Sequence, residues 1–403
     1  MSDKNLRDAV ILSAVRTPMG RFRGGLASIP AQKLGAIVVR EAVKRANLPD
    51  LEEIDEVLLG NVVSSGLGQN PARQASIFGD IPPAVGATTI NKVCGSGLKT
   101  VMLAAQAIKA GDGELFVTGG FESMSRAPFL VEGRMGELRY GSVEMVDALQ
   151  HDGLWDPFEN WIMGEAAEFI SDEYEVTRQA MDEYALGSHQ KALAAIDQGK
   201  FKQEIVPIEI EGRKGMVTVV DTDESPRRDT SLEALAKLPA AFKEGGKVTA
   251  GNAPGLNDGA SALVVSSRQK AEALGQKPLA RIIGYAQVAV DPKYIFIAPA
   301  RTLPKLLDKV GWTLADVDLI ELNEAYAAQV LADGYALSEA GWDWDKVNVH
   351  GGAIALGHPL GASGGRVLTT LIYALKDRGL KRGVASLCLG GGEAVALAVE
   401  LED

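Results

Sequence analysis

The chain has 403 residues, of which 46% are hydrophobic and 23% are charged, and its formal net charge is −12. This length and composition are typical of a globular protein with two or three domains. The acidic balance, without a lysine or arginine cluster, argues against general binding to nucleic acid or to anionic membranes. No segment has the ~20 apolar residues that a membrane-spanning helix needs.

The amino-terminal segment carries acidic residues among its basic ones and lacks an apolar signal core, so we expect a cytoplasmic protein. The two cysteines, Cys94 and Cys388, are then expected to remain free thiols. We expect no metal site, because two cysteines could complete a four-ligand zinc site only with two of the four histidines.

In chain order, the hydrophobic pattern first predicts a strand at 9–14 and a helix around 34–42. A second amphipathic helix is predicted at 98–108. Gly111 can end this helix, and the following "ELFVTGG" is predicted to be a strand.

Residues 121–249 interrupt this pattern with more charged and loop residues. They include a long helix predicted at 177–198 and the extended segment "IVPIEIEGRKGMVTVV". We interpret 121–249 as an inserted loop domain, since long insertions in α/β proteins often form lids or binding walls.

The order of elements returns after residue 275, which indicates an internal duplication. A strand near "ARIIGYAQVAV" and a helix near "RTLPKLLDKV" come first, and two strands in "VASLCLGGGEAVALAVEL" end the copy. The two copies lie roughly 263 residues apart, so Cys94 aligns with Gly357, the neighbour of His358.

The duplication predicts three regions. An N-terminal α/β half at 1–120 is completed by about 250–274, the insertion occupies 121–249, and a C-terminal α/β half spans 275–403. Because strands and helices alternate, we expect mainly parallel sheets covered by helices.

Cys94 lies in "NKVCGSG", between a predicted strand and a predicted helix. A cysteine just before a helix is expected to favour its thiolate, because unpaired N–H groups give the helix start a partial positive charge. Gly95 and Gly97 let a ligand approach the backbone, whose N–H groups can hold a developing oxyanion. A buried structural cysteine is the alternative interpretation.

His358, in "ALGHPLGASGG", occupies the loop equivalent to that of Cys94 in the second copy. The duplication thus predicts a Cys–His pair in which the histidine is the base. Cys388 ends a strand and precedes three glycines, so a second thiol and bare backbone amides can face a ligand there.

The segments "NKVCGSG", "LNEAYAA", "GGAIALGHPLGASGG" and "CLGGG", in this order, resemble the thiolase family of acetyl-CoA acetyltransferases and 3-ketoacyl-CoA thiolases. The likeness extends to "VRTPMGRFRGGL", "GQNPARQA", "GGFESMSRAP" and "VTAGNAPGLNDGA", so it covers nearly the whole chain. The fold that this resemblance implies is a five-layered α-β-α-β-α sandwich of two duplicated halves with an inserted loop domain.

The resemblance implies a role for each matching residue. Cys94 would be the nucleophile that accepts the acyl group, His358 its activating base, and Cys388 the acid/base at the α-carbon of acetyl-CoA or on the CoA thiol. Asn323, in "NEAYA", would hold a water in one oxyanion hole, and the backbone amides of Cys94 and Gly390 would form the other.

Contacts with coenzyme A are implied in the same way. Arg227 would touch the adenine end, and Met163 and Ala253 would lie along the acyl and CoA region. The chain departs from many short-chain members at Ile162, where they have histidine, and at Pro254, where they have serine. It also has the bulky segment "YIFI" at 294–297, and each departure either reshapes the acyl pocket or only packs.

The activity that this resemblance implies is ping-pong thiolysis of a 3-ketoacyl-CoA to acetyl-CoA and a shortened acyl-CoA, or the reverse condensation of two acetyl-CoA molecules, in fatty acid metabolism such as β-oxidation. One alternative is a decarboxylating ketoacyl-synthase-type enzyme, which would use Cys94, His350 and His358; Cys388 argues against it. The other is a non-catalytic protein that binds acyl-CoA or lipid. The resemblance further implies a homo-oligomer, dimer or tetramer, with CoA as substrate and no bound cofactor.

Overall fold

The computed structural model describes residues 5–131, 133, 142–212 and 215–402. Parts of the predicted insertion, at 132, 134–141 and 213–214, lie outside the described residues, and the last two belong to its extended segment. Within the described ranges, no helix is both long and apolar enough to cross a membrane.

One mixed sheet runs through the molecule in the order β14-β15-β16-β13-β1-β12-β5-β3-β4, with β2 paired to β12. Its two halves meet where β1 pairs with β13 at Val10 and Ile11. The strands are β1 Ala9–Arg16, β2 Gly20–Arg21, β3 Glu56–Gly60, β4 Gly86–Ile90, β5 Leu115–Ser123, β12 Asn257–Ser267, β13 Ala280–Ala289, β14 Leu319–Leu322, β15 Arg382–Leu389 and β16 Glu393–Leu401.

The strand directions correct one prediction. β3 runs parallel to β4 and β5, and β14 runs parallel to β15, whereas the other pairs in this sheet are antiparallel. The expectation of mainly parallel sheets is therefore wrong. In the second half, β15 and β16 are antiparallel because a short glycine turn joins them directly. In the first half, β12 follows the insertion and returns between β1 and β5.

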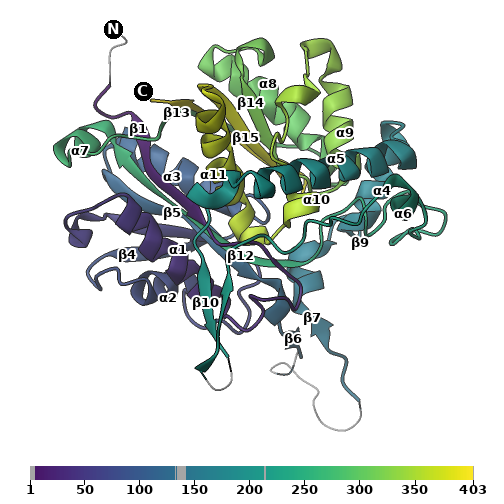
Figure 1. Cartoon of the computed structure of the whole chain (residues 1–403), viewed down its shortest axis with the longest axis horizontal. Helices are drawn as coiled ribbons and strands as arrows, with labels where there is room; N and C mark the ends of the chain where they lie inside the picture. The colour runs from purple at the N-terminus through teal and green to yellow at the C-terminus, as the bar shows by residue number, and fades with distance from the viewer. Residues whose placement is uncertain (1–4, 132, 134–141, 213–214, 403) are drawn as a thin grey trace.

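Helices form three layers around the two halves of the sheet (Figure 1). The central pair, α3 Ser96–Ala110 and α11 Leu360–Arg378, shares one apolar cluster with strands of both halves. The first half is covered by α1 Ala31–Arg45 and α2 Pro71–Phe78, with α7 Arg268–Ala273 after β12. The second half is covered by α4 Met163–Glu173, α8 Ala298–Val310 and α9 Ala327–Ala336. This is the predicted five-layered α/β sandwich.

The segment between β5 and β12 wraps around this core and projects two hairpins (Figure 1). The domain limits drawn from the sequence remain predictions. The elements here are β6 Phe129–Leu130, β7 Val146–Asp147, β8 Trp155–Asp156, β9 Trp161–Ile162, α5 Arg178–Asp197, β10 Ile208–Glu211, β11 Val217–Val220 and α6 Leu232–Ala236. Short helical turns are η1 Leu51–Glu53, η2 Met124–Arg126, η3 Leu149–Leu154, η4 Lys200–Gln203, η6 Pro292–Ile297, η7 Leu314–Asp316, η8 Ser338–Ala340, η9 Trp344–Lys346 and α10 Ala353–Leu356.

The first turns of α3 and α11 touch backbone to backbone. A Cβ atom added to Gly97 would lie 2.9 Å from the carbonyl oxygen of Gly361, and one added to Gly364 would lie 2.1 Å from the backbone nitrogen of Leu98. Only glycine permits this approach. Because the two helices begin side by side, the loops that lead into them also lie together.

Candidate active site

A cavity of about 380 Å³ lies at the junction of the two halves. Five of the predicted residues line it, namely Cys94, Met163, Ala253, His358 and Cys388. The remaining lining residues are Met124, Gly153, Leu154, Ile162, Ala241, Phe242, Thr249, Ala250, Pro254, Gly255, Leu256, Ile295, Phe296, Ala325, Tyr326 and Leu360. The lining is mostly apolar, so thiols and imidazole face a poorly hydrated space.

Cys94 sits on a tight turn between β4 and α3. Val93, just before it, has φ of 45°, which is rare and strained for a β-branched residue. The hydroxyl of Ser96 holds the turn, accepting a hydrogen bond from the Lys92 N–H (2.8 Å) and donating one to the Val93 carbonyl (2.6 Å). The strain is thus compensated locally, and the turn directs the thiol into the cavity.

The protonation state of Cys94 differs from the one expected from the sequence, in which the helix start would favour the thiolate. Burial raises the pKa of Cys94 to about 12, although hydrogen bonds from the backbone N–H groups of Gly390 and of Cys94 itself lower it. Desolvation of the thiolate therefore has a larger effect on the pKa than the partial positive charge at the start of α3. The resting group is a thiol, and it needs a base to become a nucleophile.

His358 is the candidate base that lines the same cavity as Cys94. Burial, and next the charge of Arg366, lower the pKa of His358 to about 3, so the imidazole is neutral. Its backbone N–H donates to the Asn257 side-chain oxygen (2.9 Å), and its Nδ1 lies 2.6 Å from the Ser363 hydroxyl. The other ring nitrogen, Nε2, lies 3.4 Å from the Asn323 amide nitrogen. Both sides of the ring are therefore held.

Asn323 follows β14 and is fully buried. Its backbone N–H donates to the Ser386 carbonyl at 2.9 Å, which fixes the residue against β15. The side-chain oxygen of Asn323 has no hydrogen-bond partner among the described residues. A buried, unpaired acceptor beside His358 suits a bound water, because such groups are costly when left unsatisfied.

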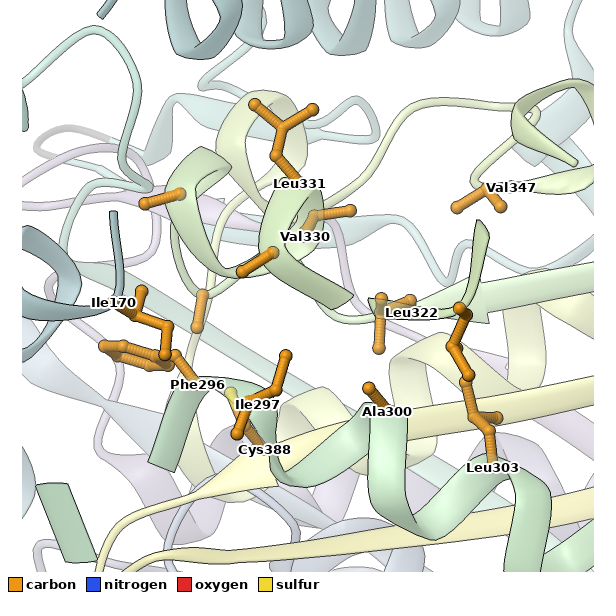
Figure 2. Packing of buried hydrophobic residues seen from close by; sticks show 14 of the residues in the cluster. Ile170, Phe296, Ile297, Ala300, Leu303, Leu322, Val330, Leu331, Val347 and Cys388 are labelled. Carbon is orange, nitrogen blue, oxygen red and sulfur yellow. The ribbon is translucent and has the colours of Figure 1, made fainter. Parts of the chain in front are cut away.

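Cys388 is 1% exposed and belongs to the same apolar cluster as Phe296 and Ile297 (Figure 2). Burial, and next the charge of Cys94, raise its pKa well above the usual value. Asp333 acts in the same direction. Two thiols facing one cavity both start protonated, so Cys388 can serve as an acid when Cys94 attacks.

A second layer of buried groups positions these loops. The Glu122 carboxylate, on β5, accepts hydrogen bonds from the backbone N–H groups of Val62 (3.0 Å), Val63 (3.2 Å) and Gly361 (3.0 Å), and from the Asn61 amide (2.9 Å). Burial raises the pKa of Glu122 to about 7. This single carboxylate ties the first half of the fold to the start of α11, next to the His358 loop.

Part of the cavity wall is aromatic. The rings of Phe296 and Tyr326 meet edge to face with centroids 5.3 Å apart, and Phe242 contacts Tyr326 at 6.3 Å. Of the segment 294–297, Ile295 and Phe296 line the cavity. Ile162 and Pro254, the other departures noted in the sequence, also line it.

Three predicted residues, Asn323, Gly390 and Arg227, are not among the residues that line the cavity. Gly390 contributes through its backbone N–H, which faces the Cys94 thiol. Arg227 lies elsewhere and is exposed, with its backbone N–H donating to His189 Nδ1 at 3.2 Å. His350, whose role the sequence left open, is buried edge-on to Phe201 and is also outside the cavity lining.

Sequence reasoning missed several residues that build the site, namely Ser363, Asn257, Glu122 and Tyr326. Ser363 follows His358 by five residues, at the start of a helix. This short separation was the one local sign in the sequence that the two side chains could meet. Asn257 and Glu122 reach the His358 loop from distant strands. Both stand in segments that carry the family resemblance, but neither hydrophobic period nor spacing indicates their contact with this loop. Within the described part of the chain, no group of three His, Cys, Asp or Glu could hold a metal.

Comparisons with known proteins agree with this architecture. Residues 9–269 match the model of the thiolase N-terminal domain, and residues 276–401 match that of the thiolase C-terminal domain. The chain is 52% identical to an acetyl-CoA acetyltransferase of Pseudomonas aeruginosa, over 97% of this chain and 99% of the relative. It is 51% identical to one of Cupriavidus necator, over 98% and 100%. The crystal structure of the Bacillus anthracis acetyl-CoA acetyltransferase superposes with a TM-score of 0.94 at 44% identity, over 98% of this chain and 99% of that one.

Two similar α/β halves enclose one cavity that is lined by two thiols and a histidine. Because the relatives that match over nearly the full length are acetyl-CoA acetyltransferases, this framework is that of an acyltransferase. With both domain models matched across nearly the full length, the chain belongs to the thiolase family.

Proposed function

We propose that this protein is an acetyl-CoA C-acyltransferase that cleaves 3-ketoacyl-CoA with CoA, or runs the reverse condensation, through an acyl group on Cys94. The observation that carries the proposal is the placement of Cys94, His358 and Cys388 around one apolar cavity. The names of the relatives from Pseudomonas aeruginosa and Cupriavidus necator support acetyl-CoA as one substrate.

In the first half-reaction, His358 Nε2 takes the thiol proton of Cys94, and the sulfur attacks the keto carbon of the substrate. The oxygen of that carbon gains negative charge, which a preorganised hydrogen-bond donor stabilises. The bond between the keto carbon and the α-carbon then breaks, and its electron pair leaves as the enolate of acetyl-CoA. Cys388 donates its proton to that α-carbon, which completes acetyl-CoA and leaves an acyl group on Cys94.

In the second half-reaction, the Cys388 thiolate takes the proton of an incoming CoA thiol, and the CoA sulfur attacks the thioester at Cys94. The tetrahedral intermediate expels the Cys94 sulfur, which regains the proton held by His358. Atoms and charge balance over the cycle, and both thiols return to the state that burial favours.

We assign the two oxyanion holes from the same geometry. The N–H groups of Cys94 and Gly390 face the nucleophile and are suited to an acyl oxygen on it. The Asn323 side chain, with its unpaired oxygen, is suited to a water that donates to the second thioester oxygen. Met163 and Ala253 would contact the acyl and pantetheine region, and exposed Arg227 the adenine end of CoA.

The aromatic wall supports a preference for short acyl chains. Phe296 and Tyr326 both line the cavity, and each packs against another ring. A rigid wall rejects longer chains because overpacking costs free energy.

We further propose that the protein is cytoplasmic, works in fatty acid metabolism such as β-oxidation, and assembles as a homo-oligomer. Two free cysteines support a reducing compartment. Large apolar side chains are exposed around the β6–β7 hairpin, at Phe129, Val131, Val143 and Met145, which supports association with another copy.

The test is thiolysis of 3-ketoacyl-CoAs of increasing chain length, followed through loss of the keto-thioester absorbance with and without free CoA. We expect CoA-dependent cleavage that is fastest for the shortest substrates and absent in Cys94→Ala. No cleavage at any length by folded protein with reduced thiols would favour acyl-CoA binding without catalysis. Loss of carbon dioxide from a malonyl thioester would favour the decarboxylating alternative.

A further inference from the structure

Ser363 lies in the first turn of α11 and contacts the ring of His358 on the side away from Asn323. Its hydroxyl oxygen is 2.6 Å from His358 Nδ1 and 2.9 Å from the carbonyl oxygen of Pro359. Both Ser363 and His358 are buried, so water does not compete for these contacts.

The two contacts constrain where the protons lie. A carbonyl oxygen only accepts hydrogen bonds, so the contact with Pro359 uses the single hydroxyl proton of Ser363. The hydroxyl oxygen is then left as an acceptor toward His358. The nitrogen Nδ1 must therefore carry a proton, because two acceptors at 2.6 Å would repel each other.

A neutral imidazole carries one ring proton, so a proton on Nδ1 leaves Nε2 with a free lone pair. Deep burial keeps the imidazole of His358 neutral, as its lowered pKa of about 3 indicates. The contact on the other side of the ring agrees, since the Asn323 amide nitrogen, a donor, lies 3.4 Å from Nε2.

We propose that Ser363 is a positioning residue that fixes His358 in its Nδ1–H tautomer and so leaves Nε2 free to accept the proton of Cys94. The inference rests on the proposed function for its catalytic consequence, whereas the tautomer itself is a property of the resting protein. In the opposite tautomer Nε2 would carry the proton, and His358 could not act as a base toward the thiol.

The helix does not need the Ser363 hydroxyl for its own stability. The Pro359 carbonyl also accepts the backbone N–H groups of Ala362 and Ser363, each at 3.0 Å. Removal of the hydroxyl therefore leaves that carbonyl hydrogen-bonded and removes the acceptor for His358 Nδ1. This separation makes the serine testable without loss of fold.

The decisive experiment is nitrogen NMR of protein labelled at histidine, in which the spectrum of a His358→Asn variant identifies the His358 signals among the four histidines. In the native protein we expect His358 to be neutral with its proton on Nδ1. In Ser363→Ala we expect the proton to shift to Nε2 or to divide between the two nitrogens. Ser363→Thr keeps the hydroxyl and should keep the native tautomer.

Rates complete the test. We expect Ser363→Ala to lower kcat and the rate of Cys94 acylation by about 10- to 100-fold, the range typical of removing a hydrogen-bond partner that orients a metal-binding histidine, with KM little changed and recovery in Ser363→Thr. The matched control is Thr369→Val, on the same helix, whose buried hydroxyl has no partner among the described residues.

Two results would overturn the inference: a proton on Nε2 of His358 in the native protein, or an unchanged tautomer in Ser363→Ala. Failure of the proposed function is distinguishable from both. A protein that shows the Nδ1–H tautomer and its dependence on Ser363, yet forms no acyl-enzyme with any 3-ketoacyl-CoA, would refute the thiolase reaction and leave the hydrogen-bond assignment intact.

Discussion

Lys92 and Glu393 form an ion pair that joins the turn carrying Cys94 to the glycine loop carrying Gly390. The pair spans the two halves of the fold, and its members stand close in the chain to Cys94 and Gly390, whose backbone N–H groups face the thiol. The side chains are 20% and 32% exposed, so solvent and salt weaken the attraction.

We predict that Lys92→Glu and Glu393→Lys each lower kcat, because like charges push the two loops apart. The expected loss is about fivefold, which corresponds to the ~1 kcal/mol of a partly exposed ion pair. The double variant restores the attraction and should recover most of the activity. Steady-state kinetics at low and high salt provide the measurement, and a double variant as slow as the single ones would contradict the prediction.

Replacing Cys94 and replacing Cys388 are expected to block different steps of the reaction. Cys94→Ala should form no acyl-enzyme, because the one other thiol among the described residues that line the cavity, Cys388, is assigned to proton transfer. Cys388→Ala should still acylate slowly but lose α-proton exchange and condensation, since its acid/base is gone. Intact-protein mass after acetyl-CoA treatment and deuterium uptake into acetyl-CoA separate the two, and near-native turnover in Cys94→Ala would refute the assignment.

The pH dependence of Cys94 follows from its burial. Because the pKa of Cys94 is raised to about 12, the thiolate fraction of the free enzyme stays small and grows as pH rises. Alkylation by iodoacetamide should therefore accelerate about tenfold per pH unit from pH ~6 to ~9 without a plateau. His358 should add no step in this range, since its lowered pKa of about 3 keeps it neutral. A plateau below pH ~8 would indicate a preformed thiolate.

Phe296 is expected to limit the acyl chain. Phe296→Leu shortens the aromatic wall, so relative rates with six- and eight-carbon 3-ketoacyl-CoAs should rise against the four-carbon substrate. The substitution should also lower the free energy of unfolding by about 1–3 kcal/mol, because Phe296 is 2% exposed. Ile297→Val is the control, since Ile297 is equally buried but does not line the cavity. An unchanged chain-length profile would assign Phe296 to packing alone.

Glu122→Gln should destabilise the fold and slow catalysis together. Four donors converge on the Glu122 carboxylate, and an amide NH₂ in its place would face some of those donors. The expected cost is about 1–3 kcal/mol, typical of unsatisfied buried donors. Denaturant titration and kcat give the readouts, with exposed Glu339→Gln as control. Native stability in Glu122→Gln would show that the network tolerates the amide.

The sequence by itself determined the duplication, the amphipathic helices and the motifs that pair Cys94 with His358. These features are local or repeat at a fixed spacing, so hydrophobic period and glycine position are enough to find them. The predicted helix end at Gly111 appears in the structure with φ of 86°, as a left-handed helix end requires, and α11 of the second half ends in the same way at Gly379 with φ of 64°.

Only the tertiary structure decided the strand directions, the protonation of the thiols and the support of His358. Strand direction depends on where β12 returns after a long insertion, which no local pattern encodes. Cys94 remains a thiol because residues of both halves bury it and raise its pKa. This effect is larger than the partial positive charge at the helix start, which was the only influence on the thiol that the sequence indicated. Glu122 and Asn257 act through hydrogen bonds that exist only once the halves are packed, because these contacts join residues far apart in the chain. Ser363 contacts His358 only once the first turn of α11 has formed.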